Sequence, residues 1–340
     1  MKPQTYGRSE FRLRQQQPAP QAATGTTAGL ANAGSKKARP SVWKEYVKTR
    51  YLFLLLAPVL IWYAIFAYGP IYGIQLAFKQ YQIMDGISGS PWVGFDNFNY
   101  LFEASPDFWK VLSNTLRLSL YHIVFGFPAP IILALLFNEI RFNAFKRITQ
   151  TLTYLPHFLS WVVLSGILFI ILSPSTGVVN FLMQKVGIEP IYFLGNGHYF
   201  RFTLVVSSIW KEVGWGTIIY LAALASIDPQ QYEAAIMDGA SRWKQTLHIT
   251  LPGLLPAIAI MFILRIGGIL DAGFDQVLNL YTPGVYSVAD IIDTYVYRMG
   301  LTQMQFSLTT AVGLFKNVIA FALVLMTNFF VKRAGQEGLL

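Results

Sequence analysis

The sequence predicts an all-α, polytopic membrane protein, and two observations support this prediction. Of 340 residues, 54% are hydrophobic and only 13% are charged, whereas ordinary soluble domains are about 25% charged. The apolar residues also fall into runs of roughly 20, the length that an α-helix needs to cross a hydrocarbon core of about 30 Å. A helix satisfies its own backbone hydrogen bonds, so helices are the expected form of such runs in lipid.

About six transmembrane helices are expected, one for each apolar run. In chain order they cover residues 51–76, 111–138, 149–173, 203–227, 254–274 and 307–331. The first follows a basic segment, the fourth contains two adjacent charges, and the sixth ends before Lys332 and Arg333. The second, third and fifth contain prolines that are expected to kink them, namely Pro128, Pro130, Pro156 and Pro256.

The segment before the first span has a different composition. Residues 1–40 are rich in Gln, Pro, Ala, Gly, Ser and Thr, and such a segment buries too little apolar surface to offset its chain entropy. We therefore expect a disordered, basic cytoplasmic tail at 1–40 and a juxtamembrane segment at 41–50. The six-helix transmembrane domain is expected to cover 51–335.

The positive charge is distributed unevenly and predicts the orientation. Residues 1–50 hold ten of the 26 Lys and Arg residues. With the amino terminus inside, 17 Lys and Arg lie in cytoplasmic segments and five in outer segments, which favours an N-in, C-in topology. The short loops alone give only seven against five. Outside the tail no basic patch is left for nucleic acid, so nucleic acid is not an expected partner.

Several kinds of chemistry are not expected on this chain. It has no cysteine, which excludes disulfides, thiolate catalysis and Cys-ligated metals. The histidines are scattered without ligand spacing, so no metal site is expected; they are His122, His157, His198 and His248. No Gly-x4-Gly-Lys-[Ser/Thr] motif and no nucleophile–base pairing is visible, so neither a phosphate-binding loop nor an enzyme is expected.

The polar segment 228–252, between the fourth and fifth spans, is the most informative part of the sequence. Asp228 followed by Pro229 is the pattern of a capped helix start. Gly239 is the residue best suited to the left-handed conformation that ends a helix, and Ser241 is placed to cap a second short helix. The punctuation predicts a compact protrusion rather than a loose linker.

One face of this protrusion is suited to docking. Glu233 and Met237 share a helical strip, and the small residues Ala234 and Ala235 permit close approach to another surface. A single carboxylate offers one site for an Arg or Lys of a partner. Pro252 is expected to stop or kink the chain before the fifth span.

The spacing Glu233-Ala234-Ala235-x3-Gly239-x9-Ile249-x-Leu251-Pro252 resembles the EAA loop of membrane subunits in ATP-binding-cassette (ABC) importers. The chain thus resembles a type I ABC importer permease with the MetI-like architecture, over most of residues 45–335. Two further runs resemble the subgroup that handles oligosaccharides and polysaccharide fragments. They read Tyr68-Gly69-Pro70-Ile71-Tyr72-Gly73 and Ser90-Pro91-Trp92-Val93-Gly94-Phe95.

The resemblance implies a coupling site and a set of partners. The implied coupling residues are Tyr232, Glu233, Ala234, Ala235, Met237, Asp238, Gly239, Ile249, Leu251 and Pro252. In that family the loop docks in a groove on the ATPase, where the Glu equivalent to Glu233 pairs with a basic residue. Expected partners are a second permease subunit in a heterodimer, two ATPase subunits that hold ATP and Mg²⁺, an extracytoplasmic solute-binding protein and the lipid bilayer. The implied location is the bacterial cytoplasmic membrane, and no cofactor is expected on this chain itself.

Charged residues within the spans need a reason, because a charge in hydrocarbon is costly. The candidate translocation path consists of Trp210, Lys211, Glu212, Trp215, Arg265 and Asp271. Adjacent helical residues point about 100° apart, so Lys211 and Glu212 are not expected to pair with each other. Either these charges pair between helices and fix the bundle, for example Glu212 with Arg265 or Lys316, or some of them line a hydrated path for a polar or acidic solute. The two tryptophans offer faces that suit sugar rings, or they only pack.

Two functions are compatible with these observations. The first is an ABC importer permease, and the second is a stand-alone channel or ion-coupled transporter that uses the intramembrane charges. The protrusion and the lack of a visible inverted repeat favour the first. The outer segments 79–110 and 275–306, the latter with a short surface helix at Ile291–Met299, are either faces for an external partner or scaffold.

Overall fold

The computed structural model describes residues 49–335, and these residues are helical apart from turns and one isolated bridge between Lys79 and Trp92. This confirms the all-α fold class. The expected tail at 1–40 and most of the juxtamembrane segment lie outside the described residues. The described residues fall into two units, one that ends at Trp62 and one that begins at Tyr63. Each unit is described by itself.

The α-helices have the following bounds: α2 Arg50–Tyr63, α3 Gly86–Gly89, α4 Asp96–Asn99, α5 Phe108–Tyr121, α6 Pro128–Glu139, α7 Asn143–Tyr154, α8 Trp161–Ile171, α9 Val178–Lys185, α10 Gly197–Leu224, α11 Pro229–Met237, α12 Arg242–Gln245, α13 Leu251–Gly267, α14 Phe274–Leu280, α15 Tyr286–Ala289, α16 Ile292–Tyr297 and α17 Phe306–Arg333. Short π or 3₁₀ segments join several of them: η1 Ala64–Tyr68, η2 Gly69–Phe78, η3 Tyr100–Ala104, η4 His122–Gly126, η5 Leu155–Phe158, η6 Thr246–Thr250, η7 Pro283–Val285 and η8 Arg298–Thr302.

Four helical stretches are long and apolar enough to cross a membrane. They are Arg50–Phe78, Phe108–Glu139, Arg242–Gly267 and Phe306–Arg333. A fifth candidate is the pair Asn143–Phe158 and Trp161–Ile171, which is bent by 104°. The helix that covers the fourth predicted span, α10, has 28 residues but is not among these stretches. The count of six spans therefore stays a prediction.

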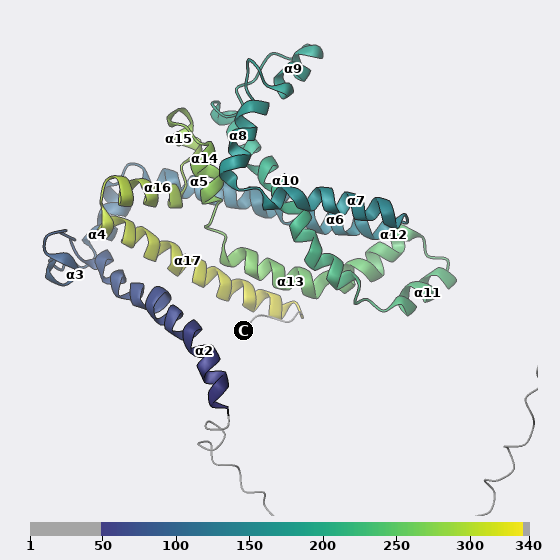
Figure 1. Ribbon diagram of the computed structural model, residues 1–340, viewed down its shortest axis with the longest axis horizontal. Helices are drawn as coiled ribbons and strands as arrows, with labels where there is room; N and C mark the ends of the chain where they lie inside the picture. Colours follow the sequence, from purple (N-terminus) through teal and green to yellow (C-terminus); the bar gives the residue numbers. More distant parts are fainter. Residues whose placement is uncertain (1–48, 336–340) are drawn as a thin grey trace, which may run out of the picture. The chain divides into compact units, whose positions relative to one another are not determined.

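Proline shapes the third predicted span as expected. Pro156 lies in η5, where the direction of the chain changes between α7 and α8 (Figure 1). Ser160 then caps α8 by accepting a hydrogen bond from the backbone N–H of Val163. The kink predicted at Pro156 is confirmed, and it divides this span into two helices.

The expectation that Pro252 stops the helix was wrong, whereas the alternative of a kink at Pro252 stays a prediction. The helical path runs from Arg242 to Gly267 without a break, and Pro252 lies in the first turn of α13. The π-helical η6 directly precedes it. A π-helical turn is a local adjustment that lets a helix accommodate a proline, which explains why the helix continues. The helix then ends earlier than the predicted 254–274, so Asp271 lies in the connection after it.

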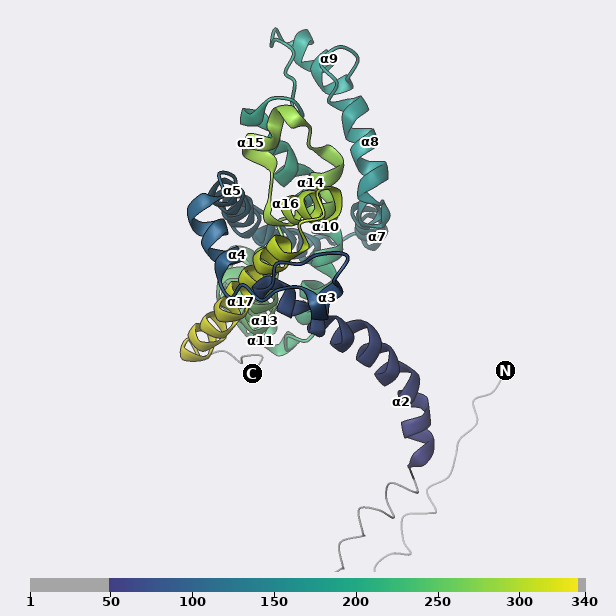
Figure 2. The ribbon, with the colours of Figure 1, turned by 90° about the vertical axis from the view of Figure 1, so that its left-hand side faces the viewer.

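α10 lies at the centre of the second unit and contacts α6, α7 and α13 along its length. Near its beginning it also contacts α14 and α15, which Figure 2 shows beside it. The buried side chains form three clusters. The first joins α5, α10, α14 and α15, the second joins η2, α5, α16 and α17, and the third joins α6, α10 and α13. The third cluster supports the base of the segment 228–252.

Candidate coupling loop and translocation path

The segment 228–252 folds as the compact protrusion that its punctuation predicts. The Asp228 carboxylate accepts a hydrogen bond from the backbone N–H of Gln230 at 2.9 Å, so Asp228 is the N-cap of α11. Gly239 has a φ of 73° and allows the chain to turn. Ser241 then accepts a hydrogen bond from the N–H of Lys244 at 3.4 Å and caps α12. Both predicted caps and the predicted turn glycine are confirmed.

Polar side chains fix the protrusion to the helices beneath it. The Tyr232 hydroxyl lies 3.0 Å from the Thr250 hydroxyl, which joins α11 to the turn that enters α13. The buried Gln245 donates to the carbonyl of Ala240 at 2.8 Å and holds the turn after Gly239. Below these bonds Ile227 packs against the third core cluster. The protrusion is therefore continuous with α10 on one side and with α13 on the other.

The outward face of the protrusion combines one carboxylate with large apolar side chains. Met237 is 86% exposed, Trp243 70% and Ile236 60%. Glu233 is exposed and makes no side-chain hydrogen bond or ion pair among residues 49–335. In Figure 1, α11 lies at the opposite end of the second unit from α16. An exposed apolar surface around a free carboxylate is typical of a protein-docking site.

The implied coupling residues divide into two groups by burial. Exposed are Glu233, Ala234, Met237, Asp238, Gly239 and Pro252, and half-buried are Tyr232, Ala235, Ile249 and Leu251. The half-buried group includes Tyr232, whose hydrogen bond to Thr250 fixes the protrusion to the turn that enters α13. The exposed group includes the carboxylate that is free to meet a partner.

The charges on α10 form a fixed cluster with the kink between α7 and α8. A ring nitrogen of His157 lies 2.8 Å from the Glu212 carboxylate. The Lys211 ammonium donates to the His157 carbonyl at 2.6 Å and lies 3.5 Å from Glu212. The expectation that Lys211 and Glu212 do not pair was wrong. The flexible stem of Lys211 lets its ammonium reach the His157 carbonyl, close to the Glu212 carboxylate that contacts the His157 ring.

Sequence reasoning missed His157, which was considered only as a metal ligand. Its ring stacks on Trp215, with centroids 4.5 Å apart and planes 2° apart. Lys211 lies 5.7 Å from the ring of Trp161. The signal that could have found His157 is its place next to Pro156, since a kink brings its own residues against the neighbouring helix. Of the two candidate tryptophans, Trp215 joins the cluster, whereas Trp210 is exposed and makes no ring contact among the described residues.

The expected pairing of charges between helices is confirmed, but the partners suggested for Glu212, namely Arg265 or Lys316, were wrong. Glu212 pairs with His157 and Lys211. Lys316 of α17 instead pairs with Asp271 and, at 2.6 Å, with Asp293 of α16. This second cluster ties the connection after α13 to α16 and α17. Glu212 and Asp271 thus belong to two separate charge clusters.

The segment 275–306 is ordered by a buried ion pair. Arg298 holds Asp290 through two bonds of 3.1 and 2.6 Å, and Thr294 donates to the same carboxylate at 2.7 Å. The hydrogen bond from Arg298 to Asp290 raises the pKa of the guanidinium. The expected helix at Ile291–Met299 is found as α16, but Ile292 and Tyr295 are buried in the second cluster. It is therefore part of the core rather than a free surface helix.

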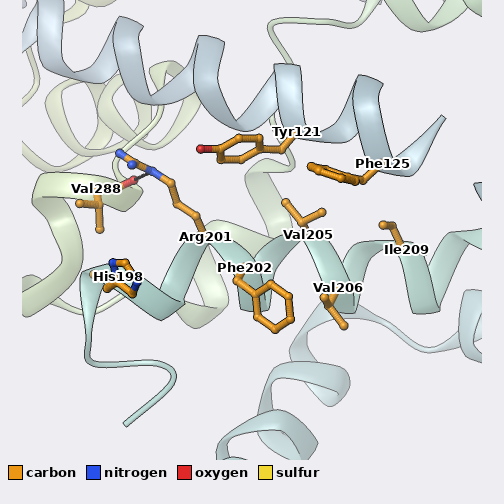
Figure 3. A pocket seen from close by; sticks show the side chains of 10 residues that line it. Tyr121, Phe125, His198, Arg201, Phe202, Val205, Val206, Ile209 and Val288 are labelled. Atoms are coloured by element: carbon orange, nitrogen blue, oxygen red, sulfur yellow. Dashed lines mark hydrogen bonds between the residues drawn. The ribbon is translucent and has the colours of Figure 1, made fainter. Parts of the chain in front are cut away.

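A cavity of about 750 Å³ lies between α10 on one side and α5 and η4 on the other (Figure 3). It is lined by Tyr121, Phe125, Gly197, His198, Arg201, Phe202, Val205, Val206, Ile209 and Val288. At one end Arg201 donates to Asn114 at 2.7 Å and to the Val288 carbonyl at 3.0 Å. Residues 49–335 contain no group of His, Cys, Asp and Glu that could hold a metal ion.

Comparison with known proteins places this architecture in one family. Residues 126–336 match the family model described as binding-protein-dependent transport system inner membrane component. The chain is 49% identical to protein LplB of Bacillus subtilis over 87% of this chain and 93% of that protein. It is 45% identical to the polygalacturonan/rhamnogalacturonan transport system permease protein YteP of the same organism, over 89% and 94%.

Solved structures agree with this assignment. A chain of a bacterial alginate ABC transporter, crystallised with an alginate pentasaccharide-bound periplasmic protein, is 42% identical with a TM-score of 0.82. The match covers 88% of this chain and 99% of that chain. A second structure, of a bacterial ABC transporter involved in import of the acidic polysaccharide alginate, is 43% identical with a TM-score of 0.81 over 86% and 98%.

The fold is that of a permease, the membrane subunit of an ABC importer, and not of an enzyme. More specifically, the chain belongs to the family of binding-protein-dependent transport system inner membrane components. It is a multi-pass component of the bacterial plasma membrane.

Proposed function

We propose that this chain moves an oligosaccharide or polysaccharide fragment across the membrane and receives the driving motion through the protrusion at 228–252. The names of its relatives support the solute class, since YteP is a polygalacturonan/rhamnogalacturonan permease and the solved neighbours transport alginate. The proposed assembly contains a second permease subunit in a heterodimer, two ATPase subunits that bind ATP and Mg²⁺, and an external binding protein that delivers the solute.

The observation that carries this proposal is a free carboxylate on a short capped helix that is tied to the bundle. Glu233 is exposed on α11, and the hydroxyl of the neighbouring Tyr232 forms a hydrogen bond with the Thr250 hydroxyl. A basic residue of an ATPase that formed an ion pair with Glu233 would act on α11, which is fixed to the helix bundle, and not on a flexible loop. Because α11 and α12 connect α10 to α13 in the chain, movement of α11 would be transmitted to both helices.

The proposed translocation path runs along α10 past Glu212 and Trp215. The stacked rings of His157 and Trp215 present flat apolar faces next to a carboxylate. Sugar rings have apolar C–H faces and a rim of hydroxyls, so a mixed surface of this kind suits them. Arg265 and Asp271 lie on the α13 side of the proposed path, and both are exposed.

The alternative of an ion-coupled transporter receives no support from the charges. Lys211, Glu212, Asp271 and Lys316 are tied into pairs. The pairs form two separate clusters, so no continuous relay connects them among residues 49–335.

The substitution Glu233→Lys tests the proposed coupling. It replaces a charge-assisted bond worth about 1.5–3 kcal/mol with repulsion, so uptake should fall at least about tenfold. ATP hydrolysis by the complex should no longer respond to solute and binding protein. Uptake into vesicles and ATPase activity of the purified complex measure these two effects.

The matched control is Glu189→Lys, which makes the same charge change at an exposed Glu outside the protrusion. Its uptake and its stimulated ATPase activity should equal those of the wild type. Normal transport by the Glu233→Lys complex would contradict the role assigned to the protrusion.

A further inference from the structure

The cavity of about 750 Å³ between α10, α5 and η4 has mainly apolar walls. On α10 its lining extends from Gly197 to Ile209, which is about 18 Å at 1.5 Å per residue. One leaflet of a bilayer contributes about half of a hydrocarbon core of about 30 Å. The cavity therefore has the length of a single lipid acyl chain.

The cavity opens to the side of the helix bundle. Three of its apolar lining residues, Phe125, Phe202 and Val206, are exposed, whereas Val205 on its inner wall is buried. In the expected N-in orientation α10 begins at the outer face, so this opening lies at the depth of the outer leaflet. Apolar walls at that depth suit a lipid tail, whereas the hydroxyls of a sugar would lose hydrogen bonds there.

The outer end of the cavity is positively charged. The charges of Arg201 and Arg117 act on each other. Among residues 49–335 no carboxylate lies within ion-pair distance of either side chain. Asn114 and the Val288 carbonyl accept hydrogen bonds from Arg201 at 2.7 and 3.0 Å, but neither supplies a negative charge. In Figure 3 the Tyr121 hydroxyl also points towards Arg201.

Arg117 belongs to the same end by its place on α5. Positions 117 and 121 are four residues apart and share one helical strip, and Tyr121 lines the cavity. In the expected topology both α5 and α10 run inwards from outer segments, so Arg117 and Arg201 each precede the apolar part of the cavity. Arg117 is exposed, and the long stem of an arginine lets its charge reach the headgroup region.

We propose that this cavity binds an anionic phospholipid of the outer leaflet, with an acyl chain between α10 and η4 and the phosphate at Arg201 and Arg117. The phosphate supplies the negative charge and the acceptor oxygens that the two guanidinium groups lack in this chain. The acyl chain covers apolar walls that would otherwise enclose an empty space. The bound lipid is a structural component of the permease, and its binding does not depend on which solute is transported.

Native mass spectrometry of the purified importer complex tests the proposal by counting bound lipid molecules. The complex is titrated with phosphatidylglycerol, with phosphatidylcholine that has the same acyl chains, and with glycerol phosphate, which has the anionic group without the chains. The wild type should bind one tightly held phosphatidylglycerol in this cavity. Its dissociation constant should be at least about tenfold lower than that of phosphatidylcholine, because two basic residues face the headgroup. Glycerol phosphate should not compete.

Two variants and two matched controls assign the bound lipid to the cavity. Val206→Trp fills the cavity from its open side and should remove one phosphatidylglycerol per complex, whereas Val318→Trp makes the same change at an exposed position of α17 and should not. Arg117→Gln should reduce the preference for phosphatidylglycerol about fivefold. Arg147→Gln, at an exposed position of α7, should leave it unchanged. Arg201 is kept in all variants, because its bonds also join α10 to neighbouring segments.

Four results would overturn the proposal. The wild type and Val206→Trp could hold the same number of lipids, which would mean that the cavity is empty or is filled by another subunit in the complex. Equal binding of the two phospholipids, or an unchanged preference in Arg117→Gln, would show that the cations do not select the headgroup. Competition by glycerol phosphate would show a site for free phosphate and not for a lipid.

Discussion

At the residue scale, Gly214 of α10 lies where α10 and α7 are in close contact. A Cβ atom at this position would collide with the backbone carbonyl of Thr153 in α7. Backbone atoms cannot move aside as the end of a side chain can, so the two helices would have to separate. Gly313 of α17 is a useful contrast, because a Cβ there meets nothing within 4 Å.

Gly214→Ala should therefore destabilise the protein by about 1–3 kcal/mol, the cost of forcing an extra carbon into a packed contact. Gly313→Ala should be neutral or stabilising by up to about 1 kcal/mol, because alanine favours a helix over glycine. Thermal unfolding of both variants in the same detergent measures the difference. Equal midpoints for the two would show that α7 and α10 are not in close contact.

The residues around Glu212 show which part of the site the sequence could predict. Charge and helical position identified Lys211 and Glu212 as unusual, and the structure places both in one cluster. Their partner His157 was not predictable, because it is 54 and 55 residues away in the chain and reaches them only through the bend after α7. Pairing between distant residues depends on tertiary geometry, which a local pattern does not contain.

At the scale of the element, the protrusion was predictable because its signals are local. Asp228, Ser241 and Gly239 each act on backbone within three residues of themselves. Pro252 was misread for the opposite reason. Its effect depends on the π-helical turn before it, and no sequence rule distinguishes a proline that a helix accommodates after such a turn from one that ends the helix.

The turn at Gly239 gives a prediction about this element. Its φ of 73° is in the left-handed region, and a Cβ would meet no atom within 4 Å. Gly239→Ala therefore adds only conformational strain, about 1–2 kcal/mol, and should reduce solute-stimulated ATPase activity while the chain still inserts. Gly239→Asn should retain most of the activity, since Asn tolerates this conformation.

The two substitutions are compared in the purified complex, with basal ATPase activity as the internal reference. If Ala and Asn reduce the stimulated activity equally, the loss comes from a contact made by the glycine itself. The left-handed turn would then not be the property that matters at this position.

At the scale of the whole molecule, the number of membrane crossings depends on α10. Its 28 residues reach about 42 Å at 1.5 Å per residue, which is long enough to span. Its composition alone does not place it among the apolar stretches, and it carries Arg201, Lys211 and Glu212. Its charges meet protein partners rather than lipid, since α6, α7 and α13 surround it. Polar residues are tolerated in a spanning helix under that condition.

Site-directed labelling decides whether α10 crosses, because three predicted spans lie between residues 84 and 237. The chain has no cysteine, so a single introduced cysteine is a unique probe. Met84 is 97% exposed and Met237 is 86% exposed, so a thiol at either position is accessible.

If α10 spans, a membrane-impermeant maleimide added to intact cells should label Met84→Cys and not Met237→Cys. In inside-out vesicles the pattern should reverse. If α10 does not span, only two crossings separate the positions and both cysteines react from the same side. That result would place the protrusion on the wrong face for an intracellular ATPase, and the proposed coupling would then fail together with the six-span topology.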